Sequence, residues 1–144
     1  MNDETSHKRP LEVFLPFKVQ TYDIDFAGIV SNITYVRWLE DLRLQLLETY
    51  YPLDTLIRDG NVPIIQTTQI EYRRPIRMFD KVTGHIWMSE FDSPRWTARM
   101  EITVNDKTAA TASQSGVFIS MLTMKPSAAP ESLQKRFDDA MREN

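Results

Sequence analysis

The sequence contains no cysteine, and this absence excludes several kinds of chemistry. Without thiols the chain forms no disulfides, has no thiol nucleophile and offers no cysteine ligands to a metal. Histidine is nearly absent too, because only His7 and His85 occur and they lie far apart in the sequence. A histidine-rich zinc site is therefore not expected.

Long apolar runs and an excess of positive charge are also missing. No apolar run approaches the roughly 18 residues that a membrane span requires, and the first ten residues are polar, unlike a signal peptide. The formal net charge is −3 at pH 7, which argues against nucleic acid as the main partner. These features predict a cytoplasmic protein with neither a membrane nor a nucleic-acid partner.

The 144 residues, of which 42% are hydrophobic and 26% charged, fit a single globular domain over 1–144. We expect residues 1–10 to form a flexible tail and residues 127–144 to form a C-terminal extension. Apolar side chains recur every fourth residue in this extension, at Leu133, Phe137 and Met141. This spacing predicts a terminal helix over 131–142.

The strongest helical pattern runs from Ile33 to Tyr50 and contains neither glycine nor proline. Its apolar face is formed by Tyr35, Leu39, Leu42, Leu46 and Tyr50. Ser31 or Asn32 is suited to cap its first turn.

Alternating apolar and polar residues predict strands on both sides of this helix. One strand precedes the helix and about four follow it in a meander, over 63–72, 82–88, 96–104 and 108–122. The first strand contains Pro16, which cannot donate to a ladder and therefore indicates an edge strand or a bulge. The pattern predicts an α+β fold in which a curved antiparallel sheet of about five strands wraps a long central helix.

Two carboxylates, Asp23 and Asp25, stand one residue apart just before the long helix. A helix start offers free N–H donors and about half a positive charge, which suits an oxyanion. A carboxylate beside it can attack a carbonyl or activate water. Spacing alone favours the plainer alternative, in which Asp25 is a solvated loop acid or a cap. Asp23 is expected to be structural or solvent-facing, and Gly28 either permits a positive φ or close approach of a substrate, or is an ordinary loop glycine.

The motif from Tyr22 to Asn32, continued by Tyr35 and by Trp38-Leu39-Glu40, resembles the hotdog-fold thioesterases. Ala27-Gly28-Ile29-Val30 and Arg37-Trp38-Leu39 are especially similar to the hydroxybenzoyl-CoA thioesterase branch. The similarity extends over roughly 13–130, and it implies a single hotdog domain that hydrolyses the thioester of an acyl- or aroyl-CoA to the free acid and CoA.

The resemblance also implies roles for individual residues. Asp25 would carry the chemistry as nucleophile or general base, in the same loop as Gly28, and the backbone amide of Asn32 would polarise the thioester carbonyl. Many relatives carry histidine at the position of Asn32, so a side-chain acid–base role is lost here.

Tyr35, Arg73 and Arg95 are the candidate substrate-binding residues. A guanidinium suits the phosphates of CoA, although ordinary surface roles for the arginines and a core role for Tyr35 remain open. Some relatives place further basic residues between the two middle strands, where this chain has Asp92, Ser93 and Pro94. The position of the phosphate site is therefore open.

The resemblance further implies no metal and no bound cofactor, since CoA is part of the substrate. It implies a homodimer or homotetramer with active sites at the subunit interface. Two alternatives stay open, namely a thioesterase acting on acyl-carrier protein and a non-catalytic acyl-binding hotdog protein. A hotdog dehydratase is disfavoured, because neither histidine stands near the helix start.

Overall fold

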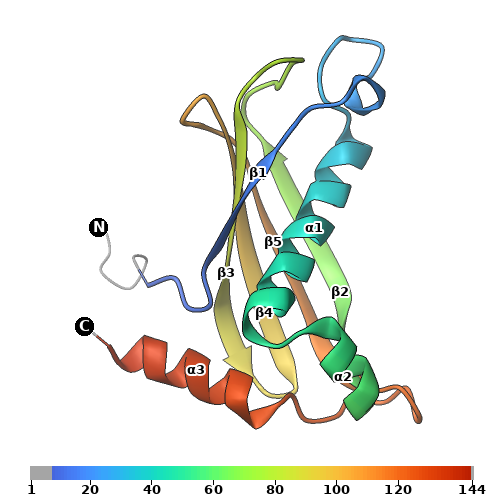
Figure 1. Ribbon diagram of the computed structural model, residues 1–144, viewed down its shortest axis with the longest axis vertical. Coiled ribbons are helices and arrows are strands. Elements are labelled where there is room, and N and C mark those ends of the chain that lie inside the picture. The colour runs from blue at the N-terminus through green and yellow to red at the C-terminus, as the bar shows by residue number, and fades with distance from the viewer. Residues whose placement is uncertain (1–7, 144) are drawn as a thin grey trace.

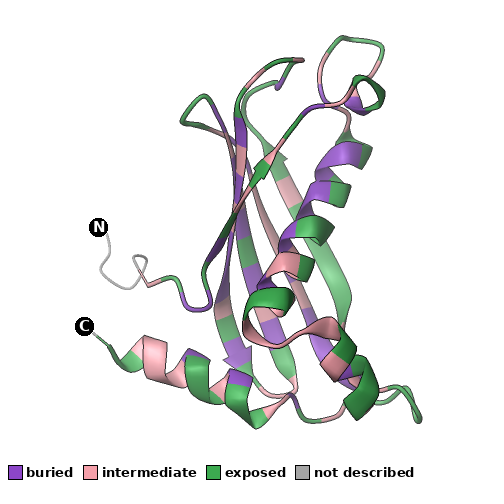
Figure 2. Ribbon diagram, viewed as in Figure 1, coloured by how far each residue is buried: buried purple, intermediate pink, exposed green. Residues whose placement is uncertain are grey.

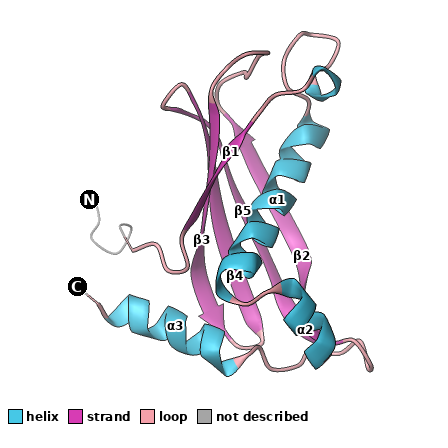
Figure 3. Ribbon diagram, viewed as in Figure 1, coloured by secondary structure: helices cyan, strands magenta, loops and turns pink. Residues whose placement is uncertain are grey.

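The computed structural model describes residues 8–143 and contains a five-stranded sheet and three α-helices (Figures 1 and 3). The elements in chain order are β1 (Val13–Phe17), the 3₁₀ turn η2 (Thr21–Asp23), α1 (Asn32–Tyr50), α2 (Leu53–Asp59), β2 (Asn61–Tyr72), β3 (Val82–Asp92), β4 (Arg95–Val104), β5 (Lys107–Ser120) and α3 (Glu131–Arg142). This architecture confirms the predicted α+β fold with one long helix against an antiparallel sheet.

The strands lie in the order β1-β3-β4-β5-β2, and every neighbouring pair is antiparallel. Strand β1 lies at an edge, the first of the two possibilities indicated by Pro16. The predicted meander of four successive strands is wrong, because only β3, β4 and β5 follow one another and β2 pairs with β5 at the far edge. Alternation in a strand shows which side chains share a face, but it does not show which strand lies beside it.

Helix α1 lies along one face of the sheet with its buried residues turned toward the strands (Figures 1 and 2). Leu42 at its centre has no exposed surface, and burial of each such leucine contributes about 2 kcal/mol. Gly84 of β3 lies beneath it, where an added Cβ would stand 3.0 Å from the Leu42 side chain and 2.5 Å from Phe17. The absence of a side chain at Gly84 lets the side chains of Leu42 and Phe17 pack closely on β3.

The N-terminal segment packs on the body of the protein from Lys8 onward. The amide of Met88 donates to the carbonyl of Pro10 at 2.8 Å, and the Arg9 guanidinium lies 3.8 Å from the centre of the Trp87 ring. The prediction of a flexible tail is therefore wrong for residues 8–10, which the cation–π contact helps to hold. Residues 1–7 of the predicted tail lie outside the described part.

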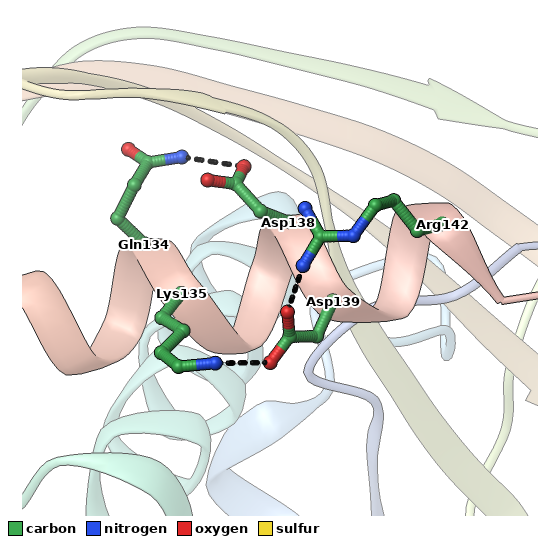
Figure 4. A network of polar contacts seen from close by, with 5 residues as sticks. All are labelled: Gln134, Lys135, Asp138, Asp139 and Arg142. Atoms are coloured by element: carbon green, nitrogen blue, oxygen red, sulfur yellow. Dashed lines mark hydrogen bonds and ion pairs between the residues drawn. The ribbon is translucent and has the colours of Figure 1, made fainter.

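Helix α3 confirms the helix predicted from the spacing of its apolar residues. It buries Leu133 and Phe137 and carries a polar network on its surface (Figure 4). In this network Gln134 donates to Asp138, while Lys135 and Arg142 both pair with Asp139. Across residues 8–143, no helix is both long and apolar enough to cross a membrane.

Candidate active site

Asp23 anchors the loop that joins β1 to α1. Its side chain is buried, and its carboxylate accepts from the Gln20 amide at 2.8 Å and from the Thr34 hydroxyl at 3.2 Å. Its carbonyl accepts from the Ser31 amide at 2.9 Å. Asp23 is thus structural, one of the two roles expected, and it is not solvent-facing. It fixes the loop against the first turn of α1.

Asp25 begins a tight turn in this loop. Its carbonyl accepts from the Gly28 amide at 3.0 Å, and its Oδ1 accepts from the Ala27 amide at 2.8 Å. The other carboxylate oxygen has no hydrogen-bond partner among residues 8–143. The hydrogen bond from Ala27 fixes the orientation of the carboxylate. Because Asp25 is only half-buried, its second oxygen remains accessible to a ligand.

Gly28 completes the turn with φ +79°, in the left-handed region that favours glycine. A Cβ added at Gly28 would meet no atom within 4 Å. Glycine is therefore favoured here by the positive φ and not by steric crowding within the chain. Its amide already donates to Asp25. The contribution of Gly28 to the site is therefore the shape of the turn.

The first turn of α1 presents unpaired backbone amides beside Asp25. Ser31 is the N-cap, and its hydroxyl accepts from the Thr34 amide at 3.4 Å. The amides of Asn32 and Ile33 have no acceptor among the described residues, as expected at a helix start. They carry the positive end of the helix dipole, so they form an anion-accepting position.

A pocket of about 310 Å³ joins these groups. Its walls come from the loop, from α1 and from the chain segment after β2, and they include Asp25, Asn32, Tyr35, Tyr72, Arg73 and Arg74. The amide of Val30 donates to the carbonyl of Ile76 at 2.8 Å and holds the loop against that segment. The structure therefore brings together four of the six predicted site residues, leaving Gly28 in the adjoining turn and Arg95 elsewhere.

Two tyrosines, the buried Tyr35 and the exposed Tyr72, line one side of the pocket. The rings of Tyr35 and Tyr72 meet edge to face with centroids 5.0 Å apart. Burial, helped by the neighbouring Tyr72, raises the pKa of Tyr35 to about 12, and burial also raises the pKa of Tyr72. Both phenols therefore stay protonated at neutral pH and are available as hydrogen-bond donors. Tyr72 was missed by the sequence analysis, since only the tertiary contact at Ile76 brings its strand end to the loop.

The raised pKa of Tyr35 predicts a measurable dependence of stability on pH. Its pKa is 10.0 in the unfolded chain and about 12 in the folded chain. The stabilisation is complete below pH 10 and is lost as the pH rises toward 12, because the unfolded state releases its proton first. A spectrophotometric titration at 295 nm should show one tyrosine with a midpoint near 12 that disappears in Tyr35→Phe. If the titration step that Tyr35→Phe removes has its midpoint near pH 10, the assignment of the raised pKa to Tyr35 is wrong.

Arg73 and Arg74 stand at the mouth of the pocket and are exposed. Both of their amides donate to the carbonyl of Ala109, which fixes the chain just after β2. The Arg73 guanidinium pairs with Glu71 at 2.8 Å across an exposed surface. Such a pair is weak, so an incoming anion can compete for Arg73.

Arg95 lies at the opposite end of the sheet. It pairs in register with Val117, and Val117 pairs with Ile64 near the start of β2. The pocket lies beside Tyr72 at the end of the same strand, eight residues or about 26 Å away. Within one chain Arg95 does not reach the Asp25 pocket.

Residues 8–143 contain no group of three or more histidine, cysteine or acidic residues arranged to hold a metal. The predicted absence of a bound cofactor remains a prediction. The pocket is lined by the Asp25 carboxylate, by Asn32 with its free amide, and by two tyrosines and two arginines.

A family model described as the Thioesterase-like superfamily matches residues 19–137, which include all of these groups. The chain belongs to this superfamily. Membership confirms the resemblance to hotdog-fold thioesterases, and it confirms the assignment to thioester hydrolases that was predicted from the loop motif.

Solved structures similar to this superfamily member share its fold. A DHNA-CoA thioesterase from Staphylococcus aureus is 17% identical with a TM-score of 0.82, and the match covers 89% of each chain. A thioesterase from Thermus thermophilus, complexed with coenzyme A and Zn, is 20% identical with a TM-score of 0.78, over 96% of this chain and 98% of that one. A 1,4-dihydroxy-2-naphthoyl-CoA thioesterase from Synechocystis is 18% identical with a TM-score of 0.79, over 89% and 96%.

Proposed function

We propose that this chain hydrolyses the thioester of an acyl-CoA in the pocket at the start of α1, giving the free acid and CoA. One observation carries the proposal: the Asp25 carboxylate and the free amide of Asn32 line the same pocket. Thioester hydrolysis needs an activated oxygen nucleophile and a donor for the carbonyl oxygen. This pocket offers one of each.

The free amide of Asn32 would receive the carbonyl oxygen of the thioester. Negative charge grows on this oxygen as the carbonyl carbon becomes tetrahedral, and fixed N–H donors stabilise it without having to reorient. The helix dipole adds to the effect at the first turn. Collapse of the intermediate then expels the sulfur of CoA as the thiolate.

Asp25 would supply the nucleophilic oxygen in one of two ways. As a general base, its free oxygen takes a proton from water while the water oxygen attacks the carbonyl carbon. As a nucleophile, the carboxylate attacks directly and forms a mixed anhydride that water hydrolyses. The hydrogen bond from Ala27 to Oδ1 serves both routes, because it fixes the direction of the other oxygen.

The remaining groups of the pocket suit the two ends of an acyl-CoA. The protonated phenols of Tyr35 and Tyr72 lie against the position of the acyl group, where they can pack on an aryl ring or donate to a polar substituent. Arg73 and Arg74 at the mouth are placed to contact phosphates. These contacts support CoA as the carrier of the acyl group.

The edge strand β2 is the expected contact with a second copy of the chain. Within residues 8–143 it pairs only with β5, and it has no charged residue from Asn61 to Ile70. Edge strands that remain unpaired are normally protected by charges, bulges or prolines. Strand β2 has Pro63 near its start and a shift of register against β5 between Ile65 and Thr67, but the stretch from Thr67 to Ile70 contains neither a charge nor a proline. A two-fold pairing of β2 with β2 of another copy would remove the exposed edge and give a homodimer.

This pairing also gives Arg95 a route to a site. Two-fold pairing makes the two β2 strands antiparallel, so the start of β2 in one copy lies beside the end of β2 in the other. The Arg95 end of one copy then approaches the Tyr72 end of its partner. Arg95 would thus contact a ligand in the partner's site, near the interface between the subunits.

The proposed substrate class is tested by measuring free thiol released from one set of acyl groups, aromatic and aliphatic, on three carriers. The carriers are CoA, acyl-carrier protein and N-acetylcysteamine, which lacks the nucleotide phosphates. We expect the highest kcat/KM with CoA, because Arg73 and Arg74 meet its phosphates. A higher kcat/KM with acyl-carrier protein would contradict the proposal that CoA is the carrier, but it would still support thioester hydrolysis.

A further inference from the structure

Arg43, in the second half of α1, is a half-buried cation whose charge is not balanced by an ion pair. None of the ion pairs among residues 8–143 includes it. Its Nη1 donates at 2.9 Å to Gln114, which is a neutral side chain. Burial lowers the pKa of Arg43, and the nearby Glu40 carboxylate opposes this effect without cancelling it. A partly buried guanidinium is stabilised by an anion, so Arg43 is suited to receive one from a ligand.

Gln114 links Arg43 on α1 to Thr68 on the edge strand β2, and we call these three residues the polar relay. Only 2% of Gln114 is exposed. Its Oε1 accepts from Arg43, and its Nε2 donates to the Thr68 hydroxyl at 3.1 Å. Because the Thr68 oxygen accepts this bond, its own proton is free for a further acceptor. Arg43 and Thr68 are thus held on one amide and both offer donors, so a ligand at the relay has to supply acceptors.

The polar relay lies beyond the Asp25 pocket along both α1 and β2. Thr68 and Tyr72 share a face of β2 and are four residues apart, which corresponds to about 13 Å. Tyr35 and Arg43 are eight residues apart on α1, which corresponds to about 12 Å along the helix axis. The two separations agree. The relay therefore stands about 12 Å beyond the two tyrosines that line the pocket.

The face of the sheet between the tyrosines and the relay is apolar and partly open. Ile70 of β2 and Ala112 of β5 pair in register there, and both are only partly buried. Thr68 is exposed, and Tyr72 is 50% exposed. Helix α1 therefore leaves this part of β2 uncovered. An extended apolar chain that passes the two tyrosines can lie on Ile70 and Ala112 and end at the relay.

We propose that the polar relay binds a carboxylate at the far end of the acyl group, so that the preferred substrates are ω-carboxyacyl-CoA thioesters. This inference rests on the acyl-CoA hydrolysis proposed above and names the class of acyl group. The thioester carbonyl lies at the amide of Asn32, and the CoA phosphates lie toward Arg73 at the mouth of the pocket. The apolar middle of the acyl group packs on Ile70, and its terminal carboxylate accepts from Arg43 and Thr68. Hydrogen bonds between a guanidinium and a carboxylate are among the strongest in proteins, whereas a methyl end leaves the Arg43 charge unbalanced.

Matched pairs of substrates test this inference. Each pair has one ω-carboxyacyl-CoA and one alkyl acyl-CoA with the same number of carbons, over a series of chain lengths. For wild type we expect kcat/KM to favour the carboxylate member at least about tenfold at the best length, as one hydrogen bond to a charged group provides. The preference should fall at shorter and longer lengths, because the relay stands at a fixed distance from Asn32.

Variants of the relay show whether Arg43 causes the preference. Arg43→Met removes the charge and keeps a long side chain, so the ratio of kcat/KM within each pair should fall to about one. Arg43→Lys keeps the charge without the planar guanidinium and should retain part of the preference. Both members of a pair are measured on the same preparation, so a loss of folded protein cancels from the ratio. Arg37→Met is the matched control, because it removes an exposed charge from the same helix and should keep the wild-type ratio.

Dissociation constants of the same pairs, measured by calorimetry on Asp25→Asn, give the ratio with little turnover. If the protein binds these thioesters without cleaving any of them, the proposed hydrolysis is wrong, while the ratio of the dissociation constants still decides the role of the relay. The inference is overturned if neither kcat/KM nor the dissociation constant favours the carboxylate member at any length. It is also overturned if Arg43→Met keeps the preference, or weakens both members of each pair equally, because Arg43 would then only support Gln114.

Discussion

Replacing Asp25 with asparagine is expected to lower kcat about a thousandfold, within the range for loss of a general base. Asparagine keeps the side-chain oxygen that accepts from the Ala27 amide, so the turn that precedes α1 should persist. It removes the carboxylate that takes the proton or attacks the carbonyl. Because no buried contact is lost, the free energy of unfolding should change by less than about 0.5 kcal/mol.

The matched control for this variant is Asp138→Asn, which neutralises a carboxylate on α3, far from the pocket. Asparagine can still accept from Gln134 there, so both activity and stability should match wild type. Steady-state kinetics and thermal unfolding on the same preparations separate chemistry from folding. If kcat of Asp25→Asn is close to that of wild type, the Asp25 carboxylate is neither the general base nor the nucleophile.

Replacing Asn32 with proline is expected to lower kcat about a hundredfold by deleting one oxyanion donor. Asn32 is the first residue of α1, a position where proline is well tolerated because its missing N–H has no helical partner. Ser31 before it has φ −78° and ψ 157°, within the extended region that a residue preceding proline requires. The helix should therefore form normally while the pocket loses a donor.

Asn32→Ala serves as the control, because it keeps the backbone amide and removes only the side-chain amide. We expect it to retain most of the activity of wild type. The variants should differ in kcat more than in KM, since the donor acts on charge that develops in the transition state. Equal losses in Asn32→Pro and Asn32→Ala would assign the effect to the side chain and contradict a role for the amide.

The sequence predicts the elements of this fold well because their local patterns are strong. The apolar face of α1 repeats over five turns, and Ser31 caps it as one of the two residues proposed. The apolar spacing in α3 gives its bounds correctly, at Glu131 and Arg142. In each case one periodic face is buried against the rest of the protein, so the period can be read directly from the sequence.

What the sequence does not predict depends on contacts between distant segments. The placement of β2 beside β5 depends on pairing between segments about 50 residues apart. Tyr72 enters the pocket because Val30 bonds to Ile76. The packing of Arg9 on Trp87 likewise joins segments that share no local pattern.

The candidate site divides in the same way. The loop motif and the helix start are continuous in sequence, so Asp25, Gly28 and Asn32 could be proposed together. The burial of Asp23 could not be predicted, because it depends on Thr34 in the first turn of α1 facing inward. Arg95 was chosen by resemblance alone, and within one chain it lies at the opposite end of the sheet from the Asp25 pocket.

The central claim is that the Asp25 pocket breaks the thioester bond and does more than bind an acyl-CoA. A single-turnover experiment tests this most directly, with enzyme in excess over an acyl-CoA labelled at its carbonyl carbon. Free acid and free thiol are followed together, so that even slow turnover is seen. We expect one acid and one thiol per acyl-CoA, formed together if Asp25 acts as a general base, with the thiol preceding the acid if Asp25 forms an anhydride. An acyl-CoA that binds the protein and is recovered intact would contradict the account and identify a non-catalytic acyl-binding protein.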